Sequence, residues 1–552
     1  MYVIIIILFV NIIFMGNNEN FGRSTPWPIE LEQHPSFKKD REKIESKFSE
    51  NEELTPEQKH EIAVECFKQP ALFREMILEN VRIPAKVKFD GGSVLYMWLN
   101  KTCPVGCEFC FYKSPKKENK SSANELTEEG VDNVINFTND AKLDKLVLSG
   151  GGEPMLDIEK VNKLAKQIKT ESFVIATSGF WAKTELNTDK YLSQLLESSR
   201  ENLHQHTTFI RLSLDSGHLE KLSRGKGFEY VKNIINWFSK NVPNDLKFKL
   251  LIHTMNEETT VENLLNELSV QERIDRNDNA RRSTQIQLRD GLNFGIEYSQ
   301  VFDSNPLIDL KDENKETYHD EIFREFTDYL TYRRGGNMSL QFHGKNPKGL
   351  YFLLTYDGTT TIWGATPPDN ETSIYKDDYQ KTVEKNLNDI LTLGSLEKGP
   401  LYMQDIVSEI NSNAVSRAVC IGLRDFYSRL LWEEDTTRLY VSIRVVQEYI
   451  NEGRVEKETI DKWPKQIQAL VSLDKETLKS ICMESSYTIV DQYLTDPQLS
   501  AEKLATLYNL VNLGHYVITP EKMIEIVSNS KIDSKIKQDF LKNITKIKND
   551  KE

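Results

Sequence analysis

Short apolar segments alternate with amphipathic ones between about residue 93 and residue 300. The short segments are rich in Val, Ile, Leu, Phe and Thr, a composition that favours extended structure. Between them, apolar residues recur every three or four positions, which is the spacing of a buried helix face. The expected strands are Ser93–Asn100, Lys145–Gly150, Phe173–Ser178, Phe209–Asp215, Phe248–Thr254 and Thr284–Arg289.

Repeated strand–helix units predict a parallel sheet with helices outside it. Six such units favour an α/β fold built as a partial (β/α)6 TIM-like barrel over a closed eight-fold barrel. Ligands of such sheets bind at the carboxyl ends of the strands. The helix faces are marked by Val131, Val134 and Ile135; Val161, Leu164 and Ile168; Leu192, Leu195 and Leu196; Val231, Ile234, Ile235 and Phe238; and Val261, Leu264, Leu265 and Leu268.

The pattern changes on both sides of this region. Helical stretches such as Pro56–Glu79 precede it, and the chain after about residue 400 has a helical pattern throughout. Met338–Gly344 and Tyr351–Trp363 are expected strands, with a turn at Asp357-Gly358. We therefore expect an N-terminal hydrophobic tail and helical region (1–90), a core barrel (91–300), a small β-hairpin extension (301–400) and a helical C-terminal domain (401–552).

The apolar run Tyr2–Met15 is shorter than the roughly 20 residues that span a bilayer. It lacks a preceding Lys or Arg and a following cleavage site, so it is a poor signal peptide. A dispensable tail, an upstream start with Met15 as the first residue, and a weak membrane anchor all remain open. Any membrane contact is expected through this tail alone.

Composition narrows the function classes. The 552 residues are 39% hydrophobic and 28% charged, which is typical of a globular chain rather than a disordered one. The net charge of −14 argues against broad nucleic-acid binding, because a phosphate backbone is met by a basic face. Six cysteines exclude a disulfide scaffold, and reduced thiols predict a cytoplasmic location.

Three of the six cysteines, Cys103, Cys107 and Cys110, follow the first expected strand, with Pro104 and Gly106 bending the loop. A closed structural zinc site needs four ligands. Three thiolates suit a cubane iron–sulfur cluster with one open iron. A zinc site completed by a distant residue, and incidental thiols, are the alternatives.

A glycine run, Ser149-Gly150-Gly151-Gly152-Glu153-Pro154, follows the second expected strand. Glycines let the backbone approach a ligand closely, because no Cβ intervenes. An ordinary strand-to-helix turn is the alternative. The run lies one strand–helix unit after the cysteines, and this position favours a role in the same site.

The Cys-x3-Cys-x-Phe-Cys spacing and the Gly-Gly-Glu-Pro run together resemble the radical S-adenosylmethionine (SAM) superfamily. The resemblance implies one [4Fe-4S] cluster on Cys103, Cys107 and Cys110, whose fourth iron chelates SAM. It further implies that Phe109 lies near the adenine. The same resemblance assigns the methionine ammonium of SAM to Gly151, Gly152 and Glu153.

Further SAM contacts are expected at later strand ends. Ser178 ends the third expected strand, and alternation places Arg211, Ser213 and Asp215 on one face of the fourth. By resemblance, Ser213 contacts the ribose and Asp215 the ribose or the substrate; a hydrogen-bonded barrel interior is the alternative. Further candidates for a carboxylate contact to SAM or substrate are Lys249, His253 and Arg289.

Leu354–Gly364 is similar to the hairpin that opens the SPASM or twitch extension of that superfamily. The position of its usual cluster cysteine carries Trp363-Gly364-Ala365 instead. Because Cys66, Cys420 and Cys482 are scattered, we expect a single cluster. The segment with Arg273, Arg276, Arg281 and Arg282 is expected to be a solvated loop, with an anion clamp as the alternative.

The resemblance implies reductive cleavage of SAM to a 5′-deoxyadenosyl radical, which abstracts hydrogen from a peptide or small biosynthetic intermediate. A nucleoside- or sugar-like small-molecule substrate is one alternative. A non-catalytic iron–sulfur or SAM-binding protein is another. The expected partners are the substrate and an electron donor such as flavodoxin or ferredoxin, with no nucleic acid.

Overall fold

A computed structural model gives the fold of the chain. It describes residues 53–86, 94–107, 114, 125–224, 227–243, 245–255, 259–278, 281–299, 340–343, 346–362, 371–398, 400–410, 435–495 and 520–529, with 534, 537–538, 541–542 and 545. The chain divides into two compact units. We call Val87–Thr366 with Asn370–Asn386 the barrel unit, and Met1–Lys86, Pro367–Asp369 and Leu387–Glu552 the helical unit.

The barrel unit is built on one sheet with the strand order β12-β11-β10-β1-β2-β3-β4-β5-β8-β7-β6, and β9 pairs with β10 off this path. From β10 to β8 every neighbouring pair is parallel. The parallel strands are β10 (Asn346–Leu354), β1 (Val94–Met97), β2 (Lys145–Leu148), β3 (Ser172–Thr177), β4 (Thr207–Ser213), β5 (Phe248–Met255) and β8 (Asn293–Ser299). The predicted partial-barrel α/β fold is therefore confirmed.

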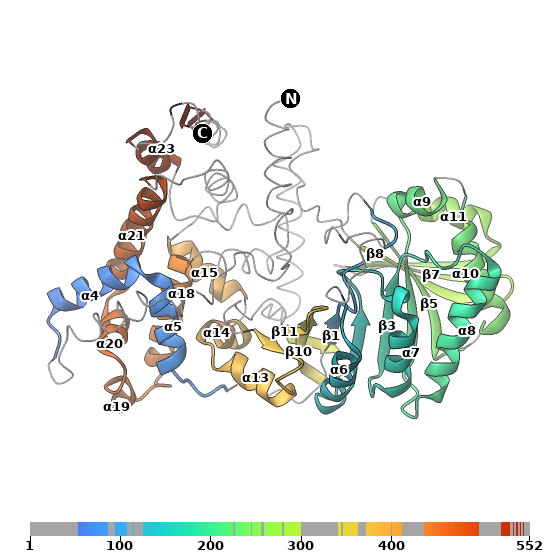
Figure 1. Ribbon diagram of the computed structural model, residues 1–552, viewed down its shortest axis with the longest axis horizontal. Coiled ribbons are helices and arrows are strands. Elements are labelled where there is room, and N and C mark those ends of the chain that lie inside the picture. Colours follow the sequence, from blue (N-terminus) through green and yellow to red (C-terminus); the bar gives the residue numbers. More distant parts are fainter. Residues whose placement is uncertain are drawn as a thin grey trace. The chain divides into compact units, whose positions relative to one another are not determined.

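Helices α6, α7, α8 and α10 lie along one face of this sheet, as Figure 1 shows. Their predicted apolar positions are buried: Val131, Leu164, Leu192 and Val231 are 0% exposed. The bounds are α6 Glu128–Asp140, η3 Pro154–Asp157, α7 Ile158–Gln167, α8 Glu185–Glu201, α9 Ser216–Ser223, α10 Glu229–Asn241, α11 Thr260–Glu267 and α13 Tyr379–Leu387.

The prediction for the sixth barrel strand is wrong. Thr284 to Leu288 lie in β7 (Arg281–Leu288), which is antiparallel to its neighbours β6 (Val270–Asp278) and β8. The strand that continues the parallel sheet beside β5 is β8. Alternation of apolar residues predicts an extended segment but not its direction, so it did not separate β7 from β8.

The arginine-rich segment is also not a loop. Arg273 and Arg276 lie in β6, and Arg281 and Arg282 begin β7, so the segment is a β-hairpin. The exposed side chain of Arg273 makes paired bonds to Glu262 Oε1 and Oε2, at 2.9 and 2.8 Å. Arg289 lies beyond the end of β7 and is exposed.

The expected hairpin extension joins the barrel sheet. Strand β10 pairs with β11 (Thr359–Ile362) through the turn at Asp357-Gly358, where Gly358 has φ of +87°. On its other side β10 lies parallel to β1, far away in sequence. Phe352 of β10 packs edge-on against Phe137 of α6. The short strands at this side are β9 (Leu340–His343) and β12 (Thr372–Ser373).

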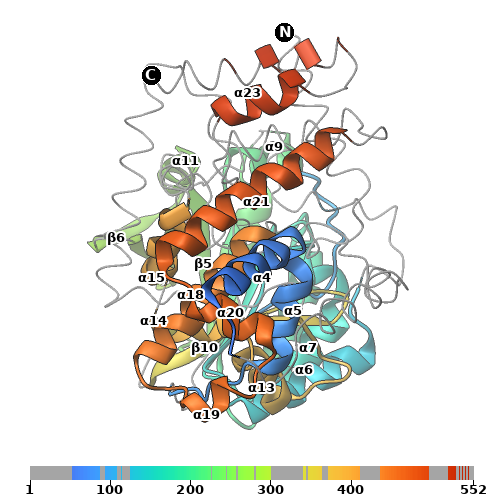
Figure 2. The same ribbon diagram turned by 90° about the vertical axis from the view of Figure 1, so that its left-hand side faces the viewer.

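The helical unit confirms the expected helical C-terminal region. In Figure 2 its helices α4, α5, α18, α20 and α21 lie together; α5 contacts α18, and α4 contacts α20 and α21. Pro70 separates two N-terminal helices where the sequence suggested one helical stretch. The bounds are α4 Pro56–Lys68, α5 Pro70–Asn80, α14 Ile390–Lys398, α15 Pro400–Ile410, α18 Asp435–Asn451, α19 Lys457–Ile460, α20 Lys465–Ser472, α21 Lys475–Thr495 and α23 Pro520–Asn529.

The expected division into four domains (1–90, 91–300, 301–400 and 401–552) stays a prediction. The two compact units described above are a different division of the chain. Within the described part of the chain, every helix is too short or too polar to cross a bilayer. The apolar run Tyr2–Met15 lies outside the described residues.

Candidate radical SAM site

The side chains of strand β4 alternate between the two faces of the sheet. Thr208, Ile210 and Leu212 are 0% exposed, whereas Arg211 and Ser213 are half-buried. This alternation places Arg211 and Ser213 on the face opposite the helices, as predicted. The polar residues therefore line the inner face of the partial barrel.

The cysteine loop follows β1. Cys103 and Cys107 are free, half-buried thiols, and Gly106 between them has φ of +65°, a conformation that turns the loop. Burial raises the pKa of Cys103 to about 11, and the nearby Glu153 and Cys107 add to that rise. The two thiols therefore lie in one neighbourhood with Glu153. Phe109 and Cys110 lie outside the described residues.

The glycine run packs directly against the cysteine loop and hydrogen-bonds to it. A Cβ on Gly152 would lie 2.1 Å from Asn100 Oδ1 and 2.6 Å from Thr102 O. The Glu153 amide donates to Thr102 O at 2.9 Å, and Asn100 Nδ2 donates to Glu153 O at 3.1 Å. Only glycine fits this approach, so the two motifs are brought together by packing as well as by strand order.

Trp98 supports the first half of the same run. Cβ atoms on Gly150 and Gly151 would lie 2.4 and 2.7 Å from the Trp98 ring. Both glycines also have positive φ, +87° and +45°. The backbone of the run thus lies flat against the indole, with no room for side chains on that side.

The Glu153 carboxylate links the glycine run to the end of β3. Its Oε1 accepts from Thr177 Oγ1 at 2.8 Å, and its Oε2 accepts from Ser178 N at 2.8 Å and Ser178 Oγ at 2.7 Å. It is 3% exposed, and burial raises its pKa against these bonds. The predicted site residues Gly151, Gly152, Glu153 and Ser178 thus form one connected group.

Asp215 lies beyond β4 and caps α9. Its Oδ1 accepts from the His218 amide at 2.8 Å, and its Oδ2 is 2.6 Å from His218 Nδ1. Burial would lower the pKa of His218, but Asp215 and then Cys107 outweigh burial and raise that pKa to about 10.

Three polar residues lie in one row across the strand ends. Ser213 of β4, His253 of β5 and Glu297 of β8 are direct partners in the sheet register. Arg211, one row deeper, has its Nε 3.8 Å from Glu297 Oε2. Burial, and then the charge of Arg211, lower the pKa of His253 to about 3, so its ring is neutral.

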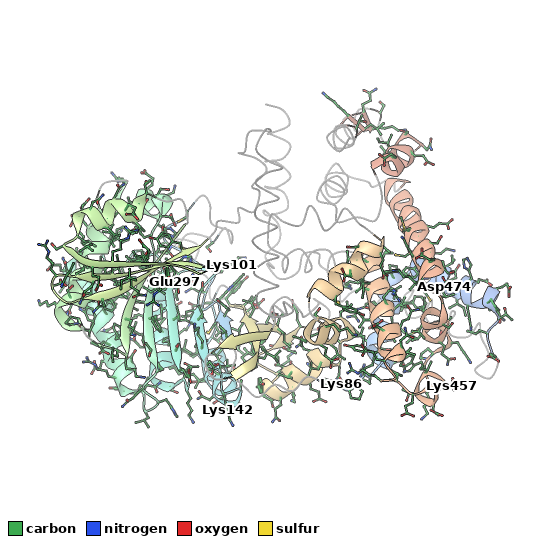
Figure 3. The ribbon with its side chains drawn as sticks, turned by 180° about the vertical axis from the view of Figure 1, so that it is seen from behind. Lys86, Lys101, Lys142, Glu297, Lys457 and Asp474 are labelled. Atoms are coloured by element: carbon green, nitrogen blue, oxygen red, sulfur yellow. The ribbon has the colours of Figure 1, made fainter. Side chains whose placement is uncertain are left out.

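The same inner face is apolar nearer the amino ends of the strands. Val94, Val147 and Val174 form a buried cluster with Tyr96 and Phe209 packed on it. Lys249 lies beside Phe209 in this deeper row, away from His253. In Figure 3, Lys101 and Glu297 lie toward one end of the sheet, and Lys142 lies at the other. The polar groups thus gather at the carboxyl end, where the fold places ligands.

The residues present fit an iron–sulfur cluster and a polar ligand beside it. Two neighbouring thiols supply sulfur donors. Buried polar atoms around them have no hydrogen-bond partner among the described residues: Asn100 Oδ1, Thr102 Oγ1, Arg211 Nε and Tyr230 Oη. Buried polar groups are normally satisfied, so this cluster of unsatisfied atoms indicates a ligand site. In the described part of the chain, no three His, Cys, Asp or Glu side chains gather as a separate metal site.

Comparison with known proteins gives one family match, which agrees with this geometry. Residues 90–212 match the family described as "4Fe-4S single cluster domain". No curated protein sequence matches the chain. Among solved structures, the chain is similar to native anSMEcpe with bound AdoMet, at 15% identity and a TM-score of 0.29 over 56% of this chain and 81% of that one. It is also similar to a histidine-tagged form of anSMEcpe with bound AdoMet, at 14% identity and a TM-score of 0.33 over 72% and 98%.

The matched segment contains the cysteine loop, the glycine run and strands β1 to β3 with most of β4. The match to a single-cluster 4Fe-4S domain agrees with the two described thiols of that loop. The individual contacts expected of Ser178, Ser213 and Asp215 with SAM stay predictions.

Several residues of the site carried no signal in the sequence. Asn100, Trp98 and Tyr230 have ordinary neighbours in the chain, and only packing shows that they surround the two motifs. Glu297 was missed because β7 was taken for the sixth strand. His218 follows Asp215 by three positions, a helix-cap spacing that could have drawn attention to it.

Proposed function

We propose that this chain is a radical SAM enzyme that carries a [4Fe-4S] cluster and abstracts hydrogen from a peptide or a small biosynthetic intermediate that carries both acidic and basic groups. The observation that supports the proposal is the mixed charge of the inner face. Arg211 supplies a cation and Glu297 an anion, 3.8 Å apart at the carboxyl end of the sheet. Glu297 is 48% exposed at its side chain, so it remains accessible to a ligand.

Different residues of the chain have different roles in this proposed reaction. When bound, the cluster and SAM supply a 5′-deoxyadenosyl radical. The cysteine loop and glycine run lie beside the strand ends, and the Glu153 carboxylate fixes Ser178 at the end of β3. The apolar cluster nearer the amino ends of the strands is buried, which supports the exclusion of water that a radical step needs.

At this end of the sheet, the neutral ring of His253 can accept or donate a hydrogen bond. Its low pKa, caused by burial and by Arg211, keeps the ring uncharged at neutral pH. The cation of Arg211 and the anion of Glu297 suit a substrate that carries charged amino and carboxylate groups. Nucleosides and sugars lack such groups, so the pair favours the peptide or amino-acid-like class.

A reductant must deliver the electron, and flavodoxin or ferredoxin is the proposed donor in a cytoplasmic setting. A cluster held by thiolates needs a reducing compartment, which supports that setting.

The test starts with anaerobic purification, reconstitution with iron and sulfide, and assay of 5′-deoxyadenosine with dithionite and SAM. Mixtures of peptides, of amino-acid-like acids and of nucleosides or sugars are then added separately. Stimulation by the first or second mixture supports the proposal, and stimulation only by the third replaces it with the small-molecule alternative. Binding of SAM without 5′-deoxyadenosine in any mixture would favour a non-catalytic protein.

Paired variants sharpen the test. Arg211→Met and Glu297→Gln should raise the KM for the stimulating substrate while the iron content stays at the wild-type level. Arg276→Met serves as the matched surface control, because Arg276 is an exposed residue of β6.

A further inference from the structure

Strand β6 forms one edge of the barrel sheet. It stands last in the strand order, and within the described part of the chain β7 is its one neighbour. It has nine residues, Val270–Asp278, and the residues from Gln271 to Arg276 are all exposed. An exposed edge strand presents backbone N–H and C=O groups that can pair with a strand of another chain. The edge at β6 is therefore a candidate for contact with a partner.

One face of β6 carries charges that already have partners within the chain. Arg273 lies on the face that carries α11, since its guanidinium donates to the two carboxylate oxygens of Glu262 at 2.8 and 2.9 Å. Asp275, two positions further on, shares this face and accepts from Arg273 Nε at 3.1 Å. These bonds hold the two side chains of β6 in place on this face.

The other face of β6 carries two opposite charges around an apolar residue. By alternation, Glu272, Ile274 and Arg276 lie on this face. Ile274 is 44% exposed although its neighbours along the strand are charged. Among the described residues, the Glu272 and Arg276 side chains have no ion-pair partner. Both charges and the isoleucine are thus available to a partner strand.

The sequence of β6 is self-complementary when two copies pair in antiparallel fashion about Ile274. Directly opposed residues of such a pair share one face of the sheet. Ile274 then opposes Ile274 of the second copy, Glu272 opposes Arg276, and Arg273 opposes Asp275. A centre at any of the four charged residues would set that residue opposite its own copy, so two like charges would meet. Charges on an edge strand usually repel a second strand, but in this one register they attract it.

We propose that β6 pairs with β6 of a second copy of this chain, centred on Ile274, and so extends the barrel sheet across a twofold axis. The contact is isologous, because each copy contributes the same strand. The two Ile274 side chains meet at the axis, and the pairs of Glu272 with Arg276 on either side fix the register. The inference concerns the assembly of the chain and does not depend on the proposed hydrogen abstraction.

The test measures the mass of the reconstituted full-length chain by sedimentation velocity over a range of concentrations. Glu272→Arg sets two arginines opposite each other at both ends of the contact, and Arg276→Glu sets two glutamates there. Lys169→Glu is the control, because Lys169 is an exposed lysine ahead of β3, on a strand that does not neighbour β6. Circular dichroism checks the fold of each variant.

We expect a wild-type dimer whose dissociation constant rises about tenfold or more with either single substitution. An equimolar mixture of the Glu272→Arg and Arg276→Glu proteins should form a heterodimer, because every arginine of one chain then faces a glutamate of the other. The double variant Glu272→Arg/Arg276→Glu exchanges the two charges and should dimerise like the wild type. Lys169→Glu should match the wild type.

A wild type that stays monomeric at every concentration would overturn the inference. So would a dimer that neither single substitution weakens, since the contact would then lie elsewhere on the molecule. If the single substitutions weaken the dimer but neither the mixture nor the double variant restores it, the register about Ile274 is wrong and the inference fails. Restoration in the mixture also shows that both variants are folded, because an unfolded chain has no β6 edge to pair.

Discussion

The two units of this protein differ in the buried polar groups they contain. In the helical unit, buried charges are paired: Arg74 Nη2 meets Asp389 Oδ2 with both side chains 0% exposed, and Arg454 pairs with Glu397. At the carboxyl end of the barrel sheet, buried polar atoms such as Thr102 Oγ1 and Tyr230 Oη have no partner among the described residues. Arg211 and Glu297 there lie 3.8 Å apart, too far for a hydrogen bond.

The difference separates scaffold from site. A buried ion pair fixes its two side chains, and removing one partner leaves the other charge without that compensation. An unsatisfied group in a cavity lowers the stability of the empty protein and is available to a ligand. Variants in the helical unit should therefore change stability, and variants at the barrel end should change cofactor and substrate binding.

The largest expected effect is at the cysteine loop. Cys107→Ala removes one of three thiolates, so iron content should fall from about four per chain and 5′-deoxyadenosine should become undetectable. Iron analysis and product assay after anaerobic reconstitution measure this. Cys482→Ala, at a buried cysteine of α21, is the control and should retain both. Full iron content in Cys107→Ala would remove this residue from the cluster site.

The buried pair of the helical unit gives the largest stability effect. Asp389 also accepts from the amides of Leu391 and Thr392, at 2.7 and 2.8 Å. Asp389→Asn should destabilise the protein by about 3–5 kcal/mol, because the buried charge of Arg74 loses its pair with the Asp389 carboxylate. Urea unfolding measures the change, and the double variant with Arg74→Met should recover part of it.

A surface pair provides the contrast for that measurement. Glu65→Gln disrupts the exposed pair with Lys68 and should change the free energy of unfolding by less than about 1 kcal/mol. Equal effects of Asp389→Asn and Glu65→Gln would contradict the scaffold role assigned to the buried pair.

Gly152→Ala tests the packing between the two motifs. The added Cβ would meet Asn100 and Thr102, so we expect a loss of about 1–3 kcal/mol together with a lower iron content. Gly453→Ala is the control in the helical unit. Its Cβ meets nothing within 4 Å, and its φ of +68° predicts a strain of only about 1–2 kcal/mol with unchanged iron. Normal iron retention in Gly152→Ala would break the proposed coupling of the motifs.

His206 tests whether every unsatisfied polar group serves binding. It lies at the amino end of β4, is 2% exposed, and neither ring nitrogen has a partner among the described residues. Burial, with Lys247 and His204 nearby, lowers its pKa to about 4. The unfolded chain then binds more protons than the folded one between pH 6.5 and 4, so stability should fall as the pH is lowered through that range.

The expected loss is at most about 3 kcal/mol by pH 4, with no effect at pH 7. Urea unfolding of wild type and His206→Phe at several pH values measures it. His206→Phe should flatten the profile, and His204→Phe at the exposed position should leave it unchanged. If all three proteins show the same change of unfolding free energy with pH, the buried His206 ring does not contribute to that pH dependence.

Much of the fold followed from local patterns. The first five barrel strands, the helices between them and the helical C-terminal region were predicted because alternation and helical spacing are properties of short segments. The pairing of β10 with β1 was not, since partner strands far apart in sequence are chosen by packing. Strand β6 and the first residues of β7 were missed, because the charged residues there resemble those of a solvated loop.

The cysteine spacing and the glycine run carried the family resemblance that implied the class of chemistry, because each motif lies within one short segment of the sequence. Only the tertiary structure decided which residues surround them. Asn100, Trp98, Glu297 and His218 reach the site from separate loops and strands, and their roles depend on contacts made across the sheet. Such contacts depend on how close the strand ends lie in the folded chain, and the sequence of a single segment does not determine that distance.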